Sequence, residues 1–148
     1  MKTLCFATLV RAPRQAVWDA MLGAETYRVW TAEFVEGSYF EGSWNKGERI
    51  RFLGPDGSGM TSAIEENWPH EFISIRHLGY VRGGVEDTDS DEVRAWAPAF
   101  EKYSLTDAGP YTKVSIALDV APDWEEYMLS AWPKALARLK AVCEARPV

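Results

Sequence analysis

The chain has 148 residues, 47% of them hydrophobic and 26% charged, and a formal net charge of −6. This length and composition fit one ordinary globular domain covering residues 1–148. The acidic balance disfavours nucleic acid and anionic lipid as partners, because basic surfaces recognise both. No segment approaches the ~20 apolar residues of a membrane span, so we expect no membrane insertion.

The N-terminal segment alternates apolar and small residues from Leu4 to Val10, which predicts a strand. It does not fit a signal peptide, because its short apolar run ends at Arg11 and lacks a small-residue cleavage site. Cys5 and Cys143 lie far apart in apolar patterns, so we expect two reduced thiols. These features together favour a cytoplasmic location.

Two short helices are expected next. Pro13 suits the first turn of a helix that Gly23 ends. The apolar side of this helix is formed by Val17, Trp18, Met21 and Leu22. A second helical segment covers residues 24–30 and should point Tyr27 and Trp30 inward.

Six further strand-like segments follow, with turn signals between them. They span residues 36–44, 49–52, 60–67, 72–78, 100–105 and 113–120. The interval 79–98 interrupts this rhythm with three glycines, the acidic run EDTDSDE and a helical turn expected around residues 92–97. Twenty residues between strands is long for a compact domain, so this interval is either a functional lid or an insertion.

The last quarter of the chain, from Asp123 to Arg146, predicts a long amphipathic helix. Its apolar face should carry Trp124, Met128, Trp132, Leu136, Leu139 and Cys143, which recur at steps of three and four. Asp123 and Glu126 have the spacing of a capping box. Pro133 lacks the N–H that would bond to the carbonyl of Leu129, so we expect a bend or break there.

The segment VRAPRQAVWDAML (residues 10–22) resembles the opening of the START-like SRPBCC superfamily. WPKALARLK (residues 132–140) resembles the closing helix of the branch related to the C-terminal domain of the heat-shock-protein ATPase activator. The resemblance implies an α+β helix-grip fold, in which a seven-stranded curved antiparallel sheet, with two short helices, holds a long C-terminal helix. It also implies a cavity between sheet and helix for an apolar or amphipathic molecule. Members range from lipid carriers to polyketide cyclases and co-chaperones, so the fold alone does not fix the function.

The acidic interval does not predict a metal site. Asp87, Asp89 and Asp91 match the first ligand positions of an EF-hand loop. However, Glu92 stands where that loop needs glycine, and Pro98 stands where it needs glutamate. Two histidines and two distant cysteines make a zinc site equally poor. We therefore expect neither metal nor cofactor, and the sequence contains no motif for covalent catalysis.

One polar constellation remains, made of His77, Glu101 and Tyr103. Strand alternation predicts that all three side chains point from neighbouring strands toward the cavity. Three interpretations stay open: the pair of His77 and Glu101 plugs the core, it anchors a ligand, or it acts as a general acid and base.

We therefore expect the chain to bind a small hydrophobic or amphipathic ligand, as a monomer or homodimer, with no catalytic residue assigned. The candidate lining residues are His77, Glu101, Tyr103, Trp30, Trp44, Phe52, Ile75, Met128 and Trp132. One alternative is an enzyme of the cyclase or dehydratase type that uses His77 and Glu101. Another is a co-chaperone-like interaction module, which would need an apolar patch on the outer sheet face. The outward positions there are mostly charged, namely Arg49, Arg51, Lys102 and Lys113.

Overall fold

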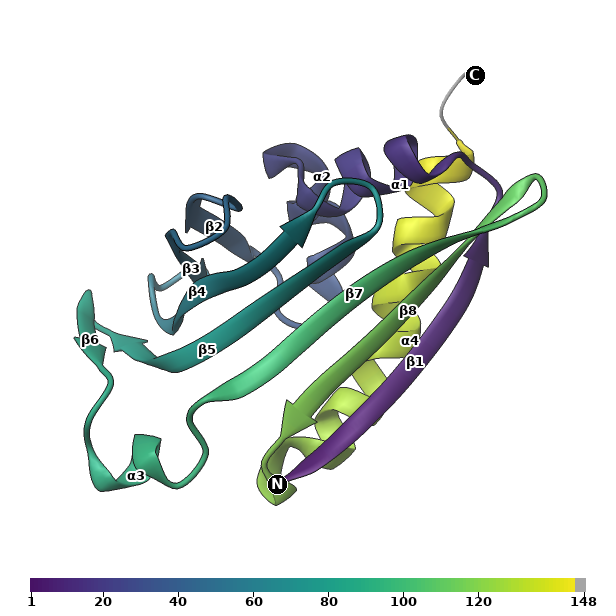
Figure 1. Ribbon diagram of the computed structural model, residues 1–148. Helices are drawn as coiled ribbons and strands as arrows, with labels where there is room; N and C mark the ends of the chain where they lie inside the picture. The colour runs from purple at the N-terminus through teal and green to yellow at the C-terminus, as the bar shows by residue number, and fades with distance from the viewer. Residues whose placement is uncertain (146–148) are drawn as a thin grey trace.

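A curved antiparallel sheet covers one side of a long C-terminal helix in the computed structural model, which describes residues 1–145 (Figure 1). Seven strands form the continuous path of the sheet, in the order β1-β8-β7-β5-β4-β3-β2. They are β1 (Lys2–Val10), β2 (Tyr39–Gly42), β3 (Arg49–Leu53), β4 (Gly59–Trp68), β5 (Phe72–Arg82), β7 (Ala99–Ala108) and β8 (Tyr111–Val120). This confirms the predicted fold class, and β1 and β2 form the two edges.

The strand pairing explains which faces carry which residues. β5 pairs with β7 so that Ile75 lies opposite Glu101 and Ile73 opposite Tyr103. Side chains alternate between the faces of a strand, and Ile73 and Ile75 are fully buried. Glu101 and Tyr103 therefore share the inner, helix-covered face of the sheet.

The helices between β1 and β2 close one end of the inner face. They are α1 (Arg14–Leu22), α2 (Ala24–Trp30) and the 3-10 helix η1 (Thr31–Glu33). Gly23 ends α1 as predicted, and its N–H donates to the carbonyl of Asp19. Tyr27 and Trp30 of α2 are both buried, as the sequence predicts.

The C-terminal helix α4 spans Pro122–Glu144 without interruption, so a break at Pro133 is wrong, whereas a bend there stays a prediction. Pro133 is exposed, and water can therefore satisfy the carbonyl that its missing N–H leaves unbonded. The predicted capping box is also wrong, because Ala121 is the N-cap and no side chain caps the helix. Pro122 begins the helix one residue early, which places Asp123 inside the first turn. The predicted end at Arg146 lies outside the described residues.

The interval 79–98 is less irregular than the sequence predicts. β5 continues to Arg82, and a turn at Gly83 and Gly84 returns the chain as β6 (Val85–Asp87), which pairs with β5. Both glycines have positive φ angles, of 58° and 81°, a conformation that side chains disfavour. A short helix, α3 (Asp91–Arg94), follows and is capped by the side chain of Ser90. The acidic run is thus part of a hairpin and a capped turn, and its role as a lid stays a prediction.

Candidate functional site

A chain of four polar side chains crosses the inner face from β4 to β7. Ser62 Oγ lies 2.7 Å from His77 Nδ1, and His77 Nε2 lies 3.0 Å from Glu101 Oε1. The hydroxyl of Tyr103 donates to Glu101 Oε2. The predicted trio of His77, Glu101 and Tyr103 is therefore brought together by the pairing of β5 and β7.

The chemistry of the groups assigns the hydrogen-bond directions. An ionised carboxylate only accepts, so His77 donates from Nε2 to Glu101 and can accept at Nδ1 from the Ser62 hydroxyl. Burial raises the pKa of Tyr103 well above its usual value, and the nearby charge of Glu101 raises it further. Burial likewise raises the pKa of Tyr27, again with a smaller contribution from Glu101. Both phenols therefore remain protonated around Glu101 at neutral pH.

Solvent exposure differs among these four polar side chains. Ser62, His77 and Tyr103 are buried, whereas 18% of the Glu101 side chain is exposed. A Ser–His–carboxylate arrangement can activate a nucleophile, but a fully buried Ser62 offers no access to a substrate. Of these four side chains, Glu101 is thus the one that an incoming molecule can reach.

Aromatic rings occupy the space beneath the sheet where a cavity was expected. Trp132 of α4 packs against Phe34 at 4.9 Å between ring centroids, and against Trp30 and Tyr103 at 5.9 and 6.0 Å. A second group of rings surrounds the polar chain on the other side and consists of Tyr27, Phe40, Trp44 and Phe52. Phe52 also contacts the His77 ring edge-on at 5.8 Å. These rings pack against one another between the sheet and α4, and among residues 1–145 the hollow described between sheet and helix lies instead at the β1 edge.

The remaining predicted lining residues are divided between core and margin. Ile75 is fully buried beneath the sheet, directly opposite Glu101. Met128 is half-buried and packs against the edge of the core. The structure therefore places all nine candidate residues on the inner side, and their role in ligand binding stays a prediction.

Sequence reasoning missed Ser62, Phe34 and Phe40. Ser62 shares a strand face with the buried Ile64, and it stands opposite His77 in the pairing of β4 with β5. A serine within an apolar alternation is a usable signal, but two register shifts in β4 obscure its partner. On β2, Tyr39 lies against Arg28, whereas its neighbour Phe40 contacts Tyr27.

The indole of Trp132 adds an unusual donor. Its Nε1 is buried and has no hydrogen-bond partner within the described chain. A buried N–H without an acceptor costs about 1–3 kcal/mol. An oxygen placed beside this nitrogen would recover that free energy.

The two cysteines and the acidic run of residues 86–92 lie outside this site. Cys5 is exposed and Cys143 is buried on α4, and no disulfide joins them. No group of three or more possible metal ligands occurs among residues 1–145. Across the same residues, no helix is both long and apolar enough to span a membrane.

Comparisons with known proteins identify the fold but not the function. No protein-family model matches the chain, and no curated protein matches it in sequence. Among solved structures, the Aha1 dimer from Colwellia psychrerythraea is 14% identical, with a TM-score of 0.74 over 98% of each chain. DynU16, from the dynemicin biosynthetic locus, is 15% identical with a TM-score of 0.71, and CalU16 from Micromonospora echinospora is 14% identical with a TM-score of 0.67.

The coverage of these two proteins is uneven. The match covers 98% of this chain but 48% of DynU16, and 97% of this chain but 76% of CalU16. The chain thus spans about half the length of DynU16. At such low identities the likeness concerns backbone architecture, and the chain has the α+β helix-grip fold of these proteins.

Proposed function

We propose that the chain binds a small hydrophobic or amphipathic ligand on the inner side of the sheet, between Glu101 and the first half of α4. The observation that carries the proposal is the partly exposed carboxylate of Glu101, held by His77 and Tyr103 at the margin of an aromatic cluster. A few fixed polar groups in apolar surroundings are typical of ligand sites.

The position of the ligand follows from the directions of the strands and the helix. Trp132 packs against Tyr103, and Glu101 lies two residues before Tyr103 on the same strand face. Met128 lies one helical turn before Trp132. Since β8 runs into the start of α4, Met128 and Glu101 lie on the same side of the contact between Trp132 and Tyr103. A ligand entering there would cover Met128 and reach the carboxylate.

The polar groups limit the ligand's chemistry. Glu101 can accept a hydrogen bond from a hydroxyl or a secondary amine. The indole N–H of Trp132 can donate to a carbonyl or ether oxygen once a ring shifts to admit it. An apolar molecule with one donor and one acceptor therefore fits this site better than a simple hydrocarbon.

The proposal includes membership of the START-like SRPBCC superfamily, near the branch of the heat-shock-protein ATPase activator. Two observations support it: the resemblance of residues 10–22 and 132–140, and the shared fold of Aha1 over 98% of both chains. Assembly as a monomer or a homodimer belongs to the same proposal, since the Aha1 structure is that of a dimer.

An acid–base enzyme of the cyclase or dehydratase type is the second candidate. Its supporting observation is that His77 and Tyr103 both bond to Glu101, so protons bound to these groups lie within reach of one carboxylate. Glu101 would then remove a proton from the bound ligand, and His77 would orient it.

The binding test uses N-phenyl-naphthylamine, a neutral apolar fluorophore with one N–H donor. Its emission should rise and saturate on addition of the protein. Glu101→Gln should weaken binding about tenfold, because a hydrogen bond to a charged group contributes about 1.5–3 kcal/mol. Glu41→Gln, an exposed position on β2, is the matched control. No saturable binding, together with no retained small molecule in native mass spectrometry of protein from cells, would contradict the proposal.

A further inference from the structure

The edge strand β1 leaves a row of backbone groups available for pairing. The β7–β8 hairpin turns through two residues, so Tyr111 bonds back to β7, and the even-numbered residues of β8 bond to β1. The even-numbered residues of β1 are their partners. Thr3, Cys5, Ala7 and Leu9 therefore direct their N–H and C=O groups away from the sheet.

This edge is only lightly protected. Lys140 donates to the carbonyl of Leu9, and Glu144 accepts from the N–H of Arg11 just beyond the strand. Within residues 1–145, no side chain bonds to the edge-facing backbone of Cys5 or Ala7. Proteins usually cover, shorten or charge such an edge, and β1 is nine residues long.

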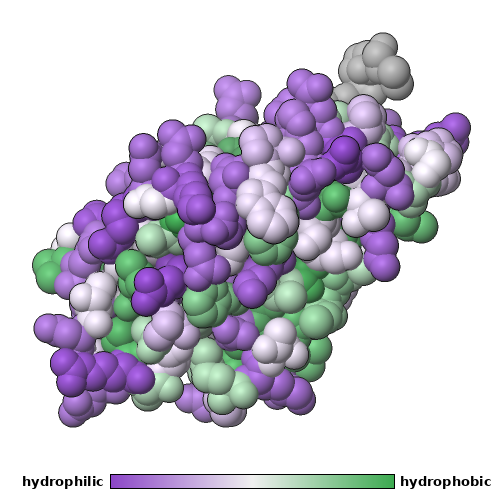
Figure 2. Space-filling model, viewed as in Figure 1, coloured by the Kyte–Doolittle hydropathy of each residue, from purple (hydrophilic) through white to green (hydrophobic). Residues whose placement is uncertain are grey.

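Two hollows flank the same part of β1. One, of about 320 Å³, lies on the outer sheet face and is lined by Cys5, Phe6, Ala7, Lys102, Ser104, Ser115, Ile116 and Ala117. The other, of about 230 Å³, lies between β1 and α4 and is lined by Phe6, Ala7, Thr8, Pro133, Leu136, Ala137 and Lys140. Figure 2 shows apolar surface over β8 and β1 on the outer face.

Hollows on both sides of one edge match the geometry of an added strand. Successive side chains of a strand point to opposite faces. A strand paired with β1 would therefore direct alternate side chains into the outer hollow and into the hollow beside α4. Peptide recognition by strand addition uses this combination of main-chain bonds and alternating pockets.

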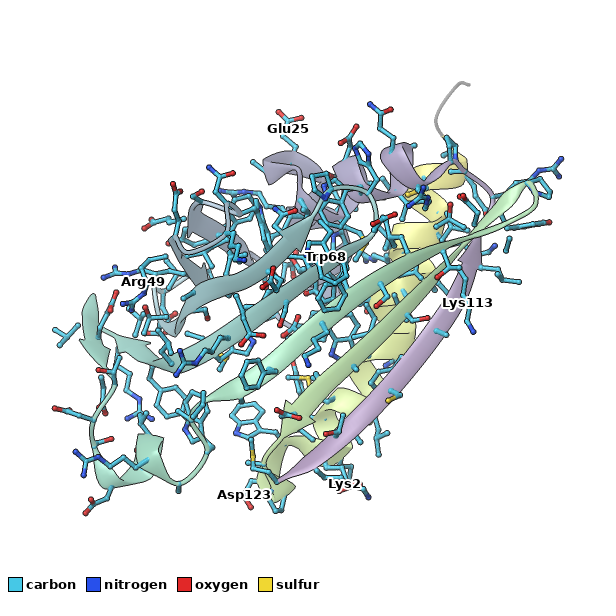
Figure 3. All side chains as sticks on the ribbon, in the orientation of Figure 1. Lys2, Glu25, Arg49, Trp68, Lys113 and Asp123 are labelled. Carbon is cyan, nitrogen blue, oxygen red and sulfur yellow. The ribbon has the colours of Figure 1, made fainter. Side chains whose placement is uncertain are left out.

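The charges select the kind of strand. The protein carries a net charge of −6, yet Lys102 lines the outer hollow and Lys113 stands beside Leu9 on the same face. Neither lysine has an ion-pair partner among residues 1–145, and Figure 3 shows Lys113 at this edge. Carboxylates on the outward side of the added strand would pair with them. The hollow beside α4, with Pro133, Leu136 and Ala137, suits apolar side chains.

A second copy of the chain fits this edge less well. Antiparallel pairing of two β1 strands about Phe6 would place Lys2 of the second copy opposite Val10. That lysine would then lie beside Arg11 and near Lys140, which reaches Leu9. Like charges in such positions oppose association.

We infer that β1 is a docking edge for an extended peptide segment of a partner protein, with apolar and acidic side chains in alternation. The segment adds as a strand beside Thr3–Leu9. Its apolar side chains enter the hollow against α4, and its acidic side chains lie over Ala7 and Ala117 toward Lys102 and Lys113. This surface lies on a different part of the sheet from Glu101, so it is independent of the proposed ligand site.

The test follows amide hydrogen exchange in the whole ¹⁵N-labelled chain by NMR. The probe is an acetylated, amidated octapeptide of alternating valine and glutamate. At saturation, exchange of the Cys5 and Ala7 amides should slow at least tenfold, because these amides become bonded. A valine–lysine octapeptide is the charge control and should give no protection.

Two variants test the hollow beside α4. Ala137→Glu should weaken binding of the valine–glutamate peptide about tenfold, since it fills that hollow and repels the acidic peptide. Ala141→Glu, exposed on the next turn and outside the lining, should bind normally. Absent protection of Cys5 and Ala7, equal binding of the lysine peptide, or protection that rises with protein concentration without peptide would each overturn the inference. The last result would identify a second copy as the occupant.

Discussion

The two halves of α4 belong to one helix but have different relations to the sheet. From Ala131 to Cys143 the helix contributes six buried residues, whereas none of residues 122–130 is buried. Trp132 is 2% exposed, and Trp124 is 49% exposed. The sequence predicts both tryptophans on one buried face, so the position of Trp124 is a correction.

The difference arises from what lies opposite each half. Trp132 contacts the rings of Phe34 directly after η1, of Trp30 in α2 and of Tyr103 in β7. The first turns of α4 lie beyond the edge of that ring cluster. There, Trp124 contacts Tyr127 of its own helix. Amphipathic spacing shows which face can be buried, but burial also requires a surface on the other side. The second half of α4 therefore stabilises the fold, while the first half leaves Trp124, Tyr127 and Leu129 exposed, where we propose that the ligand binds.

The largest expected effect is at the buried half. Trp132→Ala removes a ring packed by four aromatic neighbours and should lower the free energy of unfolding by about 3–5 kcal/mol. Urea denaturation measures the change. Trp132→Phe keeps much of the packing and should cost clearly less. A loss below about 1 kcal/mol for the alanine variant would show that the two halves do not differ as described.

Stability measurements on the polar side chains next to Trp132 distinguish a structural plug from a ligand anchor. If His77 and Glu101 plug the core, each single change to Leu leaves a partner unpaired and should cost about 1–3 kcal/mol. The double variant should then cost less than the sum of the two. If the pair serves ligand binding instead, both single variants should bind N-phenyl-naphthylamine more weakly with little loss of stability. Thermal unfolding of the three variants, with fluorophore titration, separates the two outcomes.

Alkaline pH should also lower the free energy of unfolding, through Tyr103, which packs against the buried half of α4. Tyrosine ionises near pH 10 in unfolded chains, whereas burial and the charge of Glu101 raise the pKa of Tyr103 in the fold. The unfolded state thus loses its proton first. The contribution of Tyr103 is fully present below pH 10 and decreases as the pH rises toward its folded pKa, by at most about 1.4 kcal/mol per pH unit.

Tyr103→Phe should make this alkaline loss shallower, as measured by unfolding between pH 9 and pH 11. Tyr127→Phe, on the exposed half of α4, is the matched control and should leave the slope unchanged. An identical slope in Tyr103→Phe and the unaltered chain would contradict the assignment.

Local pattern was sufficient to predict the sheet and the site's polar trio. Period-two alternation placed His77 and Glu101 on inner positions of neighbouring strands, and the pairing of β5 with β7 confirms it. Ser62 was not predicted because bulges in β4 change the register locally, which single-strand alternation does not reveal. The filled interior was not predicted either. Whether rings such as Phe34 and Trp132 leave a cavity depends on rotamers and contacts between distant segments, which sequence spacing does not specify.

Pro133 stands near the start of the buried half and should give a smaller effect of opposite sign. Pro133→Ala restores an N–H that can bond to the carbonyl of Leu129, and alanine favours the helix interior. Because the helix is already continuous and the site exposed, we expect a gain of about 1 kcal/mol in the free energy of unfolding. Denaturation with urea measures it. A loss of stability would show that the proline ring itself is required beside β1, where it lines a hollow.

The smallest effect on stability is expected at Trp124. Trp124 is exposed, and the ring that it contacts, Tyr127, is exposed as well, so Trp124→Ala should change the free energy of unfolding by no more than about 0.5 kcal/mol. The same variant should weaken binding of N-phenyl-naphthylamine, because the ring lies one turn before Met128 on the half of α4 assigned to the ligand. Tyr39→Ala is the control for loss of a ring elsewhere, since Tyr39 lies on β2 with its ring against Arg28 of α2. Since stability and binding respond separately, normal binding by Trp124→Ala would place the ligand away from the first half of α4 even if the fold is intact.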